Sequence, residues 1–233
     1  MSRRVREQYS EWASTYDEEK VKLFERAGIS YREFMDSFVE CCGLKPGMSI
    51  LDVGAGTCLT SICLAKALSG NCRIRGIEPV GAMVERAEEN IKRASLEGVI
   101  SVEEARGESI PWPDESYDLV VCTFAIRHMD IETALREFLR VLKPGGRIVI
   151  AEICAPEKWR TPLGRILSFI VTRFLSIKRK HRSEAKSRVL TVSEWKQLLE
   201  RVGVKSIRIR EFYGKKDPGW ETKRVIICVT KRF

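Results

Sequence analysis

This 233-residue sequence has few features of a transmembrane or a secreted protein. No apolar run reaches the ~20 residues needed to span a bilayer, and the longest stretch, 163–177, is interrupted by two arginines. The N-terminus is polar and contains no apolar signal region. We therefore expect a cytoplasmic protein.

Cysteine pairs spaced for redox chemistry are also missing, since none of the eight cysteines occurs in a C-x-x-C pair. Disulfide frameworks are typical of small secreted chains, whereas a chain of this length can bury its own core. We expect reduced, buried thiols that pack as small hydrophobic groups. A reactive role for Cys41, Cys42 and Cys154 is the alternative. Histidine is scarce too, so His128 and His181 are the only candidates for a histidine base, and we expect no bound metal.

Positive charge is abundant but concentrated in one segment. The chain carries a net charge of +9, and 156–188 alone holds ten Lys and Arg against two Glu. Such a local basic segment predicts one anionic partner surface and argues against general nucleic-acid coating. Within it, 164–177 reads as an apolar helix followed by a basic run at 178–182, as in elements that lie on anionic membranes. A cap helix over an active site with a solvated basic tail is the alternative, and a lipid substrate would reconcile the two.

Strands and helices alternate through the middle of the chain. Near-continuous apolar strands separated by helices predict a parallel sheet covered on both faces. The final two strands lack a helix between them and should pair antiparallel. The predicted strands are 49–53, 72–77, 99–104, 117–123, 147–153, 204–212 and 225–230. The predicted helices begin near residue 58 and cover 80–93, 131–142 and 193–202, the last capped by Ser193.

The first part of the chain reads as helical. Tyr9, Trp12 and Tyr16 recur at helical spacing, and an apolar stripe runs along 31–42. We therefore divide the chain into an N-terminal helical lid at 1–47 and a core at 48–233, with a basic cap insert at 155–190 inside the core.

A glycine turn follows the first strand, in the sequence Asp52-Val53-Gly54-Ala55-Gly56-Thr57. It is not a P-loop, and Leu59 stands where the dinucleotide fingerprint needs its third glycine. Asp52 ends a buried strand, where an acid is costly unless it is paired or faces a ligand. A cationic ligand therefore fits this turn better than a pyrophosphate.

Glu78 ends the second strand, at the sheet edge where open α/β folds bind ligands. A carboxylate there can accept both hydroxyls of a ribose. A helix-capping role for Glu78 is the alternative, and the glycine turn beside it favours ribose binding.

Four segments in order, 51–57, 76–79, 109–114 and 140–146, resemble the successive motifs of class I S-adenosylmethionine-dependent methyltransferases. The resemblance implies a Rossmann-like α/β fold, with a seven-stranded mostly parallel sheet, helices on both faces, and S-adenosylmethionine as cofactor. By the same resemblance the cofactor-binding residues are Asp52, Gly54, Ala55, Gly56, Thr57, Glu78, Pro79, Met83, Arg106, Gly107 and Thr123.

Two positions depart from the family pattern. Cys58 replaces the third glycine that relatives usually carry. Arg106 stands where an aspartate usually accepts from the adenine amino group, and arginine cannot accept a hydrogen bond. Backbone carbonyls, Glu104 or Glu108 are the alternatives for that acceptor.

Within the family, 124–128 and 9–17 look most like the C-methyltransferases of ubiquinone and menaquinone biosynthesis. The resemblance implies that Arg127 assists proton removal from the acceptor ring, with His128 beside it and Tyr16 as a lid residue. Purely structural roles are the alternative for all three. We therefore expect methyl transfer to a small or lipid-like acceptor, for which a quinone precursor is the leading candidate. RNA methylation, arsenite methylation and a catalytically silent cofactor-binding scaffold are the competing hypotheses.

Overall fold

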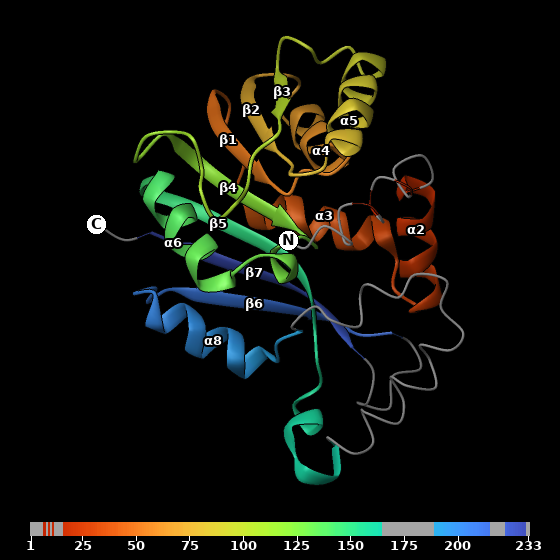
Figure 1. Ribbon diagram of the computed structural model, residues 1–233, viewed down its shortest axis with the longest axis vertical. Coiled ribbons are helices and arrows are strands. Elements are labelled where there is room, and N and C mark those ends of the chain that lie inside the picture. Colours follow the sequence, from red (N-terminus) through yellow and green to blue (C-terminus); the bar gives the residue numbers. More distant parts are fainter. Residues whose placement is uncertain are drawn as a thin grey trace.

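A twisted sheet of seven strands runs through the centre of the molecule (Figure 1). The computed structural model describes residues 16–164, 189–214 and 222–231, together with Glu7, Tyr9 and Glu11. The strands are β1 (Met48–Val53), β2 (Cys72–Ile77), β3 (Ile100–Glu103), β4 (Tyr117–Thr123), β5 (Leu142–Cys154), β6 (Ile207–Phe212) and β7 (Lys223–Thr230). Their order is β3-β2-β1-β4-β5-β7-β6, and only β7 runs antiparallel to its neighbours within this described sheet. The predicted Rossmann-like sheet with a C-terminal antiparallel hairpin is therefore confirmed.

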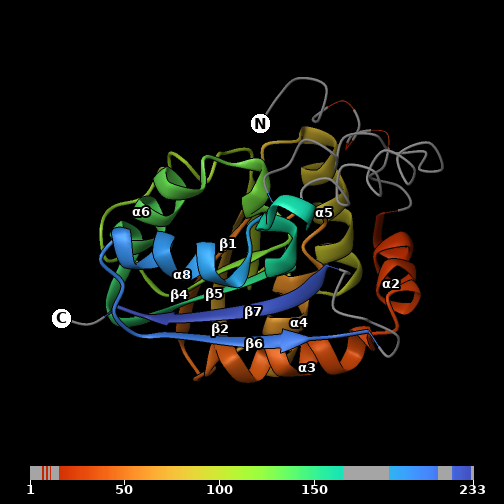
Figure 2. The ribbon, with the colours of Figure 1, turned by 90° about the horizontal axis from the view of Figure 1, so that it is seen from below.

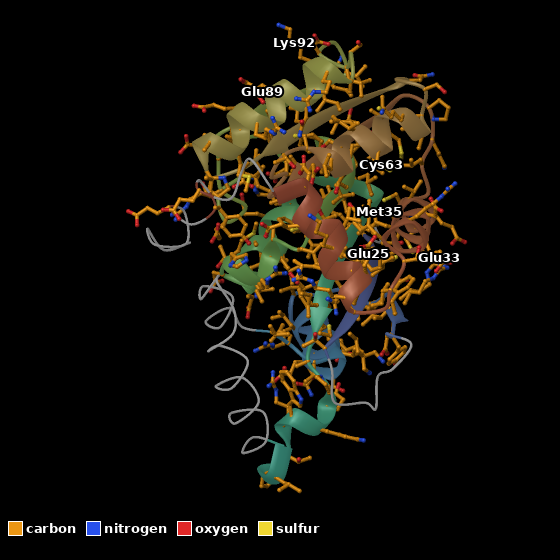
Figure 3. The ribbon with its side chains drawn as sticks, turned by 90° about the vertical axis from the view of Figure 1, so that its right-hand side faces the viewer. Glu25, Glu33, Met35, Cys63, Glu89 and Lys92 are labelled. Atoms are coloured by element: carbon orange, nitrogen blue, oxygen red, sulfur yellow. The ribbon has the colours of Figure 1, made fainter. Side chains whose placement is uncertain are left out.

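Helices cover both faces of the sheet (Figure 2). Buried residues of α3, α4 and α5 pack on one face, and those of α6 and α8 pack on the other. Figure 3 looks onto the first layer, where Lys92 and Glu89 label α5, Cys63 labels α4 and Met35 labels α3. The helices are α2 (Tyr16–Arg26), α3 (Tyr31–Cys42), α4 (Leu59–Ala67), α5 (Gly81–Arg93), α6 (Ile131–Val141) and α8 (Val192–Arg201), with short 3-10 turns η1 (Ile126–His128) and η2 (Glu157–Arg160).

Several predicted boundaries are wrong by one to five residues; strand β6, for example, begins at Ile207 and not at residue 204. Helix α8 begins one residue earlier than expected, and its cap is Thr191, not Ser193. The Thr191 hydroxyl accepts from the Glu194 amide while the Glu194 carboxylate accepts from the Thr191 amide, a reciprocal arrangement that satisfies two amide donors. Strand β5 also starts earlier, at Leu142, because the segment predicted only to stop the preceding helix continues directly into the sheet.

Several sequence expectations fall outside the described residues. They include Trp12, the side chain of Tyr16, His181 and most of the basic cap insert, of which 165–188 is not described. Within the described part of the chain, none of the helices is long and apolar enough to cross a membrane.

Cys58 shows how the glycine turn tolerates its missing third glycine. The residue lies immediately before α4 with φ +61°, in the left-handed region that favours glycine, and its side chain is fully buried. Residues other than glycine are strained in this conformation by about 1 kcal/mol. The turn thus adopts a conformation that favours glycine although Cys58 carries a side chain.

This strain predicts that glycine is a more stable replacement than alanine at position 58, the reverse of the order expected in a strand. We expect Cys58→Gly to be more stable than Cys58→Ala by about 1 kcal/mol, because only glycine adopts this φ freely. Urea unfolding of both variants measures the difference. Cys122, equally buried in β4, is the matched control, and there alanine should be the more stable replacement. Alanine being favoured at both sites would contradict the strain.

Candidate functional site

A cavity of about 590 Å³ lies at the carboxyl ends of the parallel strands. The ends of β1, β2 and β4 contribute to it, which places it where ligands bind in open α/β sheets. Its lining consists of Tyr9, Gly54, Gly56, Glu78, Pro79, Met83, Arg106, Gly107, Glu108, Thr123, Phe124, Ala125, His128 and Met129.

Two glycines form a cradle that no side chain could share. Gly54 has φ +69°, and a Cβ there would come within 2.3 Å of the Ala125 Cβ. A Cβ on Gly107 would come within 2.7 Å of both Val53 and Met129. Bare backbone at both positions lets a ligand lie directly against the main chain.

Glu78 presents a buried carboxylate between the glycine turn and α5. Its Oε2 accepts from the Gly56 amide at 3.0 Å, and its Oε1 accepts from the Val80 amide at 3.2 Å. Burial raises its pKa to about 7, although these two amide donors act in the opposite direction. The carboxylate thus both supports the start of α5 and lines the cavity.

Eight of the eleven cofactor-binding residues expected from the sequence line the cavity, and three do not. The Asp52 carboxylate is fully buried and accepts from the Ser61 hydroxyl at 2.7 Å. Ala55 lies in the turn, with its amide donating to the Ile77 carbonyl. Thr57 is buried, with its hydroxyl directed away to the N-terminal helix. These three residues shape the turn from behind.

Asp17 connects helix α2 to that turn. Its carboxylate accepts from the Thr57 hydroxyl at 2.6 Å and from the Asn90 amide at 3.3 Å. The same Asn90 amide donates to the Thr57 carbonyl at 3.0 Å. One carboxylate therefore joins the N-terminal segment, the glycine turn and α5.

Aromatic and apolar side chains also line the cavity. The Tyr9 hydroxyl lies 3.1 Å from His128 Nε2, and the two rings meet edge to face. Burial, aided by the nearby Arg127, lowers the pKa of His128 to about 4, so the imidazole is neutral at physiological pH. Phe124 adopts φ +58° and packs against Phe24.

The sequence interpretation did not assign Tyr9, Phe124, Ala125 or Met129 to the site. The position of 124–129 directly after a central strand was the available signal, since strand ends in this fold line ligand sites. For Tyr9 no local pattern exists, because its contact with His128 spans 119 residues.

Arg127 is directed elsewhere. Its guanidinium forms an ion pair with Glu152 at 2.5 Å, and both side chains are nearly inaccessible, at 8% and 2% exposure. Arg127 is not part of the cavity lining. Near the other end of the cavity, Glu108 and Arg106 contribute to the lining whereas Glu104 does not.

The cysteines named for a reactive role do not come together. Cys154 belongs to the core on the α6 and α8 side of the sheet, whereas Cys42 belongs to the core on the opposite side, and Cys41 packs against that second core. The sheet thus separates Cys154 from the other two.

Comparison with known proteins identifies the domain. Residues 51–150 match the family described as a methyltransferase domain. A ubiquinone/menaquinone biosynthesis C-methyltransferase of Geobacter sulfurreducens is 33% identical over 178 residues, which cover 75% of this chain and 66% of that protein. The protein of the same name from Geotalea daltonii is 34% identical over 155 residues, covering 66% and 65%. The aligned part of the chain spans just under two thirds of the length of these relatives.

Solved structures agree on the fold. A SAM-dependent methyltransferase from Aquifex aeolicus has a TM-score of 0.62 at 22% identity, covering 84% of this chain and 88% of that one. A geranyl diphosphate methyltransferase solved with SAM has a TM-score of 0.69 at 13% identity, covering 85% and 84%. A [4+2]-cyclase, SpnF, reaches 0.68 at 20% identity, covering 86% and 81%. At such identities these similarities establish the fold alone.

The cavity has the features that such a cofactor needs. The cradle at Gly54 and Gly107 leaves the backbone open, and the Glu78 carboxylate offers acceptors for hydroxyl groups. With the matched domain and the two bacterial relatives, these features identify residues 51–150 as a class I S-adenosylmethionine-dependent methyltransferase domain, a family whose cofactor is S-adenosylmethionine.

Proposed function

We propose that this protein transfers a methyl group from S-adenosylmethionine to a carbon atom of a lipid-like acceptor. A quinone precursor is the leading candidate for that acceptor. The observation that carries the proposal is the mixed lining of the cavity. Glycine backbone and the Glu78 carboxylate share it with the aromatic and apolar side chains of Tyr9, Phe124 and Met129. An aromatic and apolar wall suits a ring or an isoprenoid-like chain. The names of the two bacterial relatives point in the same direction.

For the cofactor, we assign direct contact to the lining residues and support to those behind them. Glu78 would accept from the ribose hydroxyls, and Gly54, Gly56 and Gly107 would lie against the cofactor. Asp52, Ala55 and Thr57 would hold the turn in shape. Pro79, Met83, Arg106 and Thr123 complete the proposed cofactor contacts. Glu108, which lines the cavity where Glu104 does not, is the proposed acceptor for the adenine amino group.

Methyl transfer asks the protein mainly to align the acceptor, because the bound sulfonium supplies an already activated methyl group. A base is needed only when the acceptor must lose a proton. His128 lines the cavity in its neutral form and can accept a proton. We propose that it orients the acceptor together with Tyr9, while Arg127 assists from behind. Tyr16 stays a proposed lid residue, and its side chain lies outside the described residues.

The basic insert completes the proposal. Its apolar and basic composition at 164–188 suits peripheral contact with an anionic lipid surface, from which a lipid-like acceptor could enter.

Labelled methyl transfer tests the proposed acceptor class. The protein is incubated with methyl-labelled S-adenosylmethionine and either a bacterial lipid extract or total RNA. We expect label in a lipid product, with the methyl group on carbon and stable to hydrolysis. Gly56→Arg is the inactive control, because its side chain would fill the cavity at a residue with φ +55°. Label confined to RNA would overturn the lipid assignment.

The buried Glu78 predicts a pH-dependent cofactor affinity. Its pKa near 7 in the ligand-free protein should fall when ribose hydroxyls donate to the carboxylate, so binding releases a proton. Affinity for S-adenosylhomocysteine should therefore rise by up to about tenfold per pH unit between pH 5 and 7 and then level off. Calorimetry across this range measures the effect. Glu78→Gln should bind more weakly with a flat profile; an unchanged slope in that variant would exclude Glu78 as the titrating group.

Variants of the Arg127–Glu152 pair distinguish an assisting role of Arg127 in the reaction from a purely structural role. Arg127→Met should destabilise the fold by about 3–5 kcal/mol, because it leaves a buried carboxylate without its cation. The double variant Arg127→Met/Glu152→Leu removes both charges and should regain most of that stability. If Arg127 assists the reaction, methyl transfer by the stable double variant stays low. Activity that returns together with the melting temperature would show a structural role only.

A further inference from the structure

A second hollow lies between the end of α3 and the β6–β7 hairpin, and two cysteines form part of its wall. It measures about 920 Å³ and shares no lining residue with the cofactor cavity. Its lining consists of Glu40, Cys41, Arg208, Ile209, Arg210 and Cys228. Cys41 lies in the last turn of α3 and Cys228 lies in β7, so the fold brings together two thiols that are far apart in the sequence.

The two thiols share the wall of this hollow, and Cys41 packs against the core cluster that contains Cys228. Cys41 is partly exposed, whereas Cys228 is only 8% exposed. A reagent in the hollow therefore meets Cys41 first.

Arg208 and Arg210 line the same hollow as the two cysteines, and their positive charges favour a thiolate there. Arg210 forms an ion pair with Glu40 at 2.7 Å, which ties the residue before Cys41 to β6. Arg208 stands opposite Cys228 in the β6–β7 register. The Cys228 hydrogen bond, and after it the positive charge of Arg210, lower the pKa of Cys41 to about 7 despite partial burial. A large fraction of Cys41 is thus thiolate at neutral pH.

The pKa values of other cysteines are raised, not lowered. Burial raises the pKa of Cys63 and of Cys72, which are also partly exposed. The same is true of the buried Cys58 and Cys154. Thiolate character and access coincide at Cys41, and these two properties determine which cysteine an oxidant attacks.

We propose that Cys41 and Cys228 form an oxidation site that reduces a hydroperoxide and closes to a reversible disulfide. The Cys41 thiolate attacks the peroxide oxygen, the S–O bond forms as the O–O bond breaks, and the alkoxide or hydroxide leaves. Cys41 is now a sulfenic acid without negative charge, so Cys228 is free to lose its proton.

Cys228 then attacks the Cys41 sulfur and closes the site. The S–S bond forms, the S–O bond breaks, and the hydroxyl leaves as water with the Cys228 proton. In total, two thiols are oxidised by two electrons, and one hydroperoxide is reduced to an alcohol and water. The disulfide joins the end of α3 to β7, and a thiol reductant reverses it.

Peptide mapping after mild oxidation tests this site in the full-length protein. The reduced protein is treated with hydrogen peroxide at pH 7, its remaining thiols are alkylated under denaturing conditions, and the digest is analysed by mass spectrometry. We expect the loss of two of the eight thiols and a linked peptide pair containing Cys41 and Cys228. Dithiothreitol should restore both. Absence of this linked pair, or links only between molecules, would overturn the proposal.

Variants assign the order of events. In Cys228→Ser, Cys41 should stop at the sulfenic acid and be trapped by dimedone; in Cys41→Ser, Cys228 should remain reduced. Cys72→Ser is the matched control for a partly exposed cysteine and should form the disulfide as the wild type does. Arg210→Gln should shift the pH profile of Cys41 alkylation to higher pH without preventing it. Equal alkylation rates at Cys41 and Cys72 in the wild type would contradict a selective thiolate.

Discussion

The β1 turn lies against the loop after β4 only because Gly54 has no side chain. A Cβ at that position would come within 2.3 Å of Ala125. The same loop supplies Met129, whose sulfur would come within 2.7 Å of a Cβ on Gly107. Glycines in two segments therefore let three parts of the chain pack closely around one cavity. A side chain at Gly54 or Gly107 would push these segments apart.

Helices α2 and α5 are joined to the same turn by hydrogen bonds. Asp17 of α2 accepts from the Thr57 hydroxyl, and Asn90 of α5 donates to both Asp17 and the Thr57 carbonyl. The turn thus has a fixed position relative to two helices that are remote in sequence. Preorganisation of this kind lowers the entropy lost when a ligand binds.

The sequence predicted the sheet because its signals are local. Apolar strands, glycine and proline breaks, and the Glu78 position all lie within short segments whose pattern fixes their structure. The cap of α8 was also present locally, since Glu194 follows Thr191 by three residues as a capping box requires. By contrast, Tyr9 with His128 and Cys41 with Cys228 join residues more than 100 positions apart. Such pairs arise only from the folded topology, so the glycine turn and Glu78 were predictable from the sequence, whereas the Tyr9–His128 part of the cavity lining was not.

The charges around the cavity suit a cationic ligand. A protonated imidazole or a free guanidinium beside a sulfonium would repel it strongly in a medium of low dielectric constant. His128 is neutral because burial lowers its pKa to about 4, and the charge of Arg127 is compensated by Glu152. Arg106, also in the lining, is exposed to solvent, which screens its charge. Glu78, the buried acid of the lining, gains its charge most readily when a donor or a cation is bound. Because the protein keeps its own positive charges paired, neutral or solvated around the cavity, the cofactor can contribute the reactive positive charge.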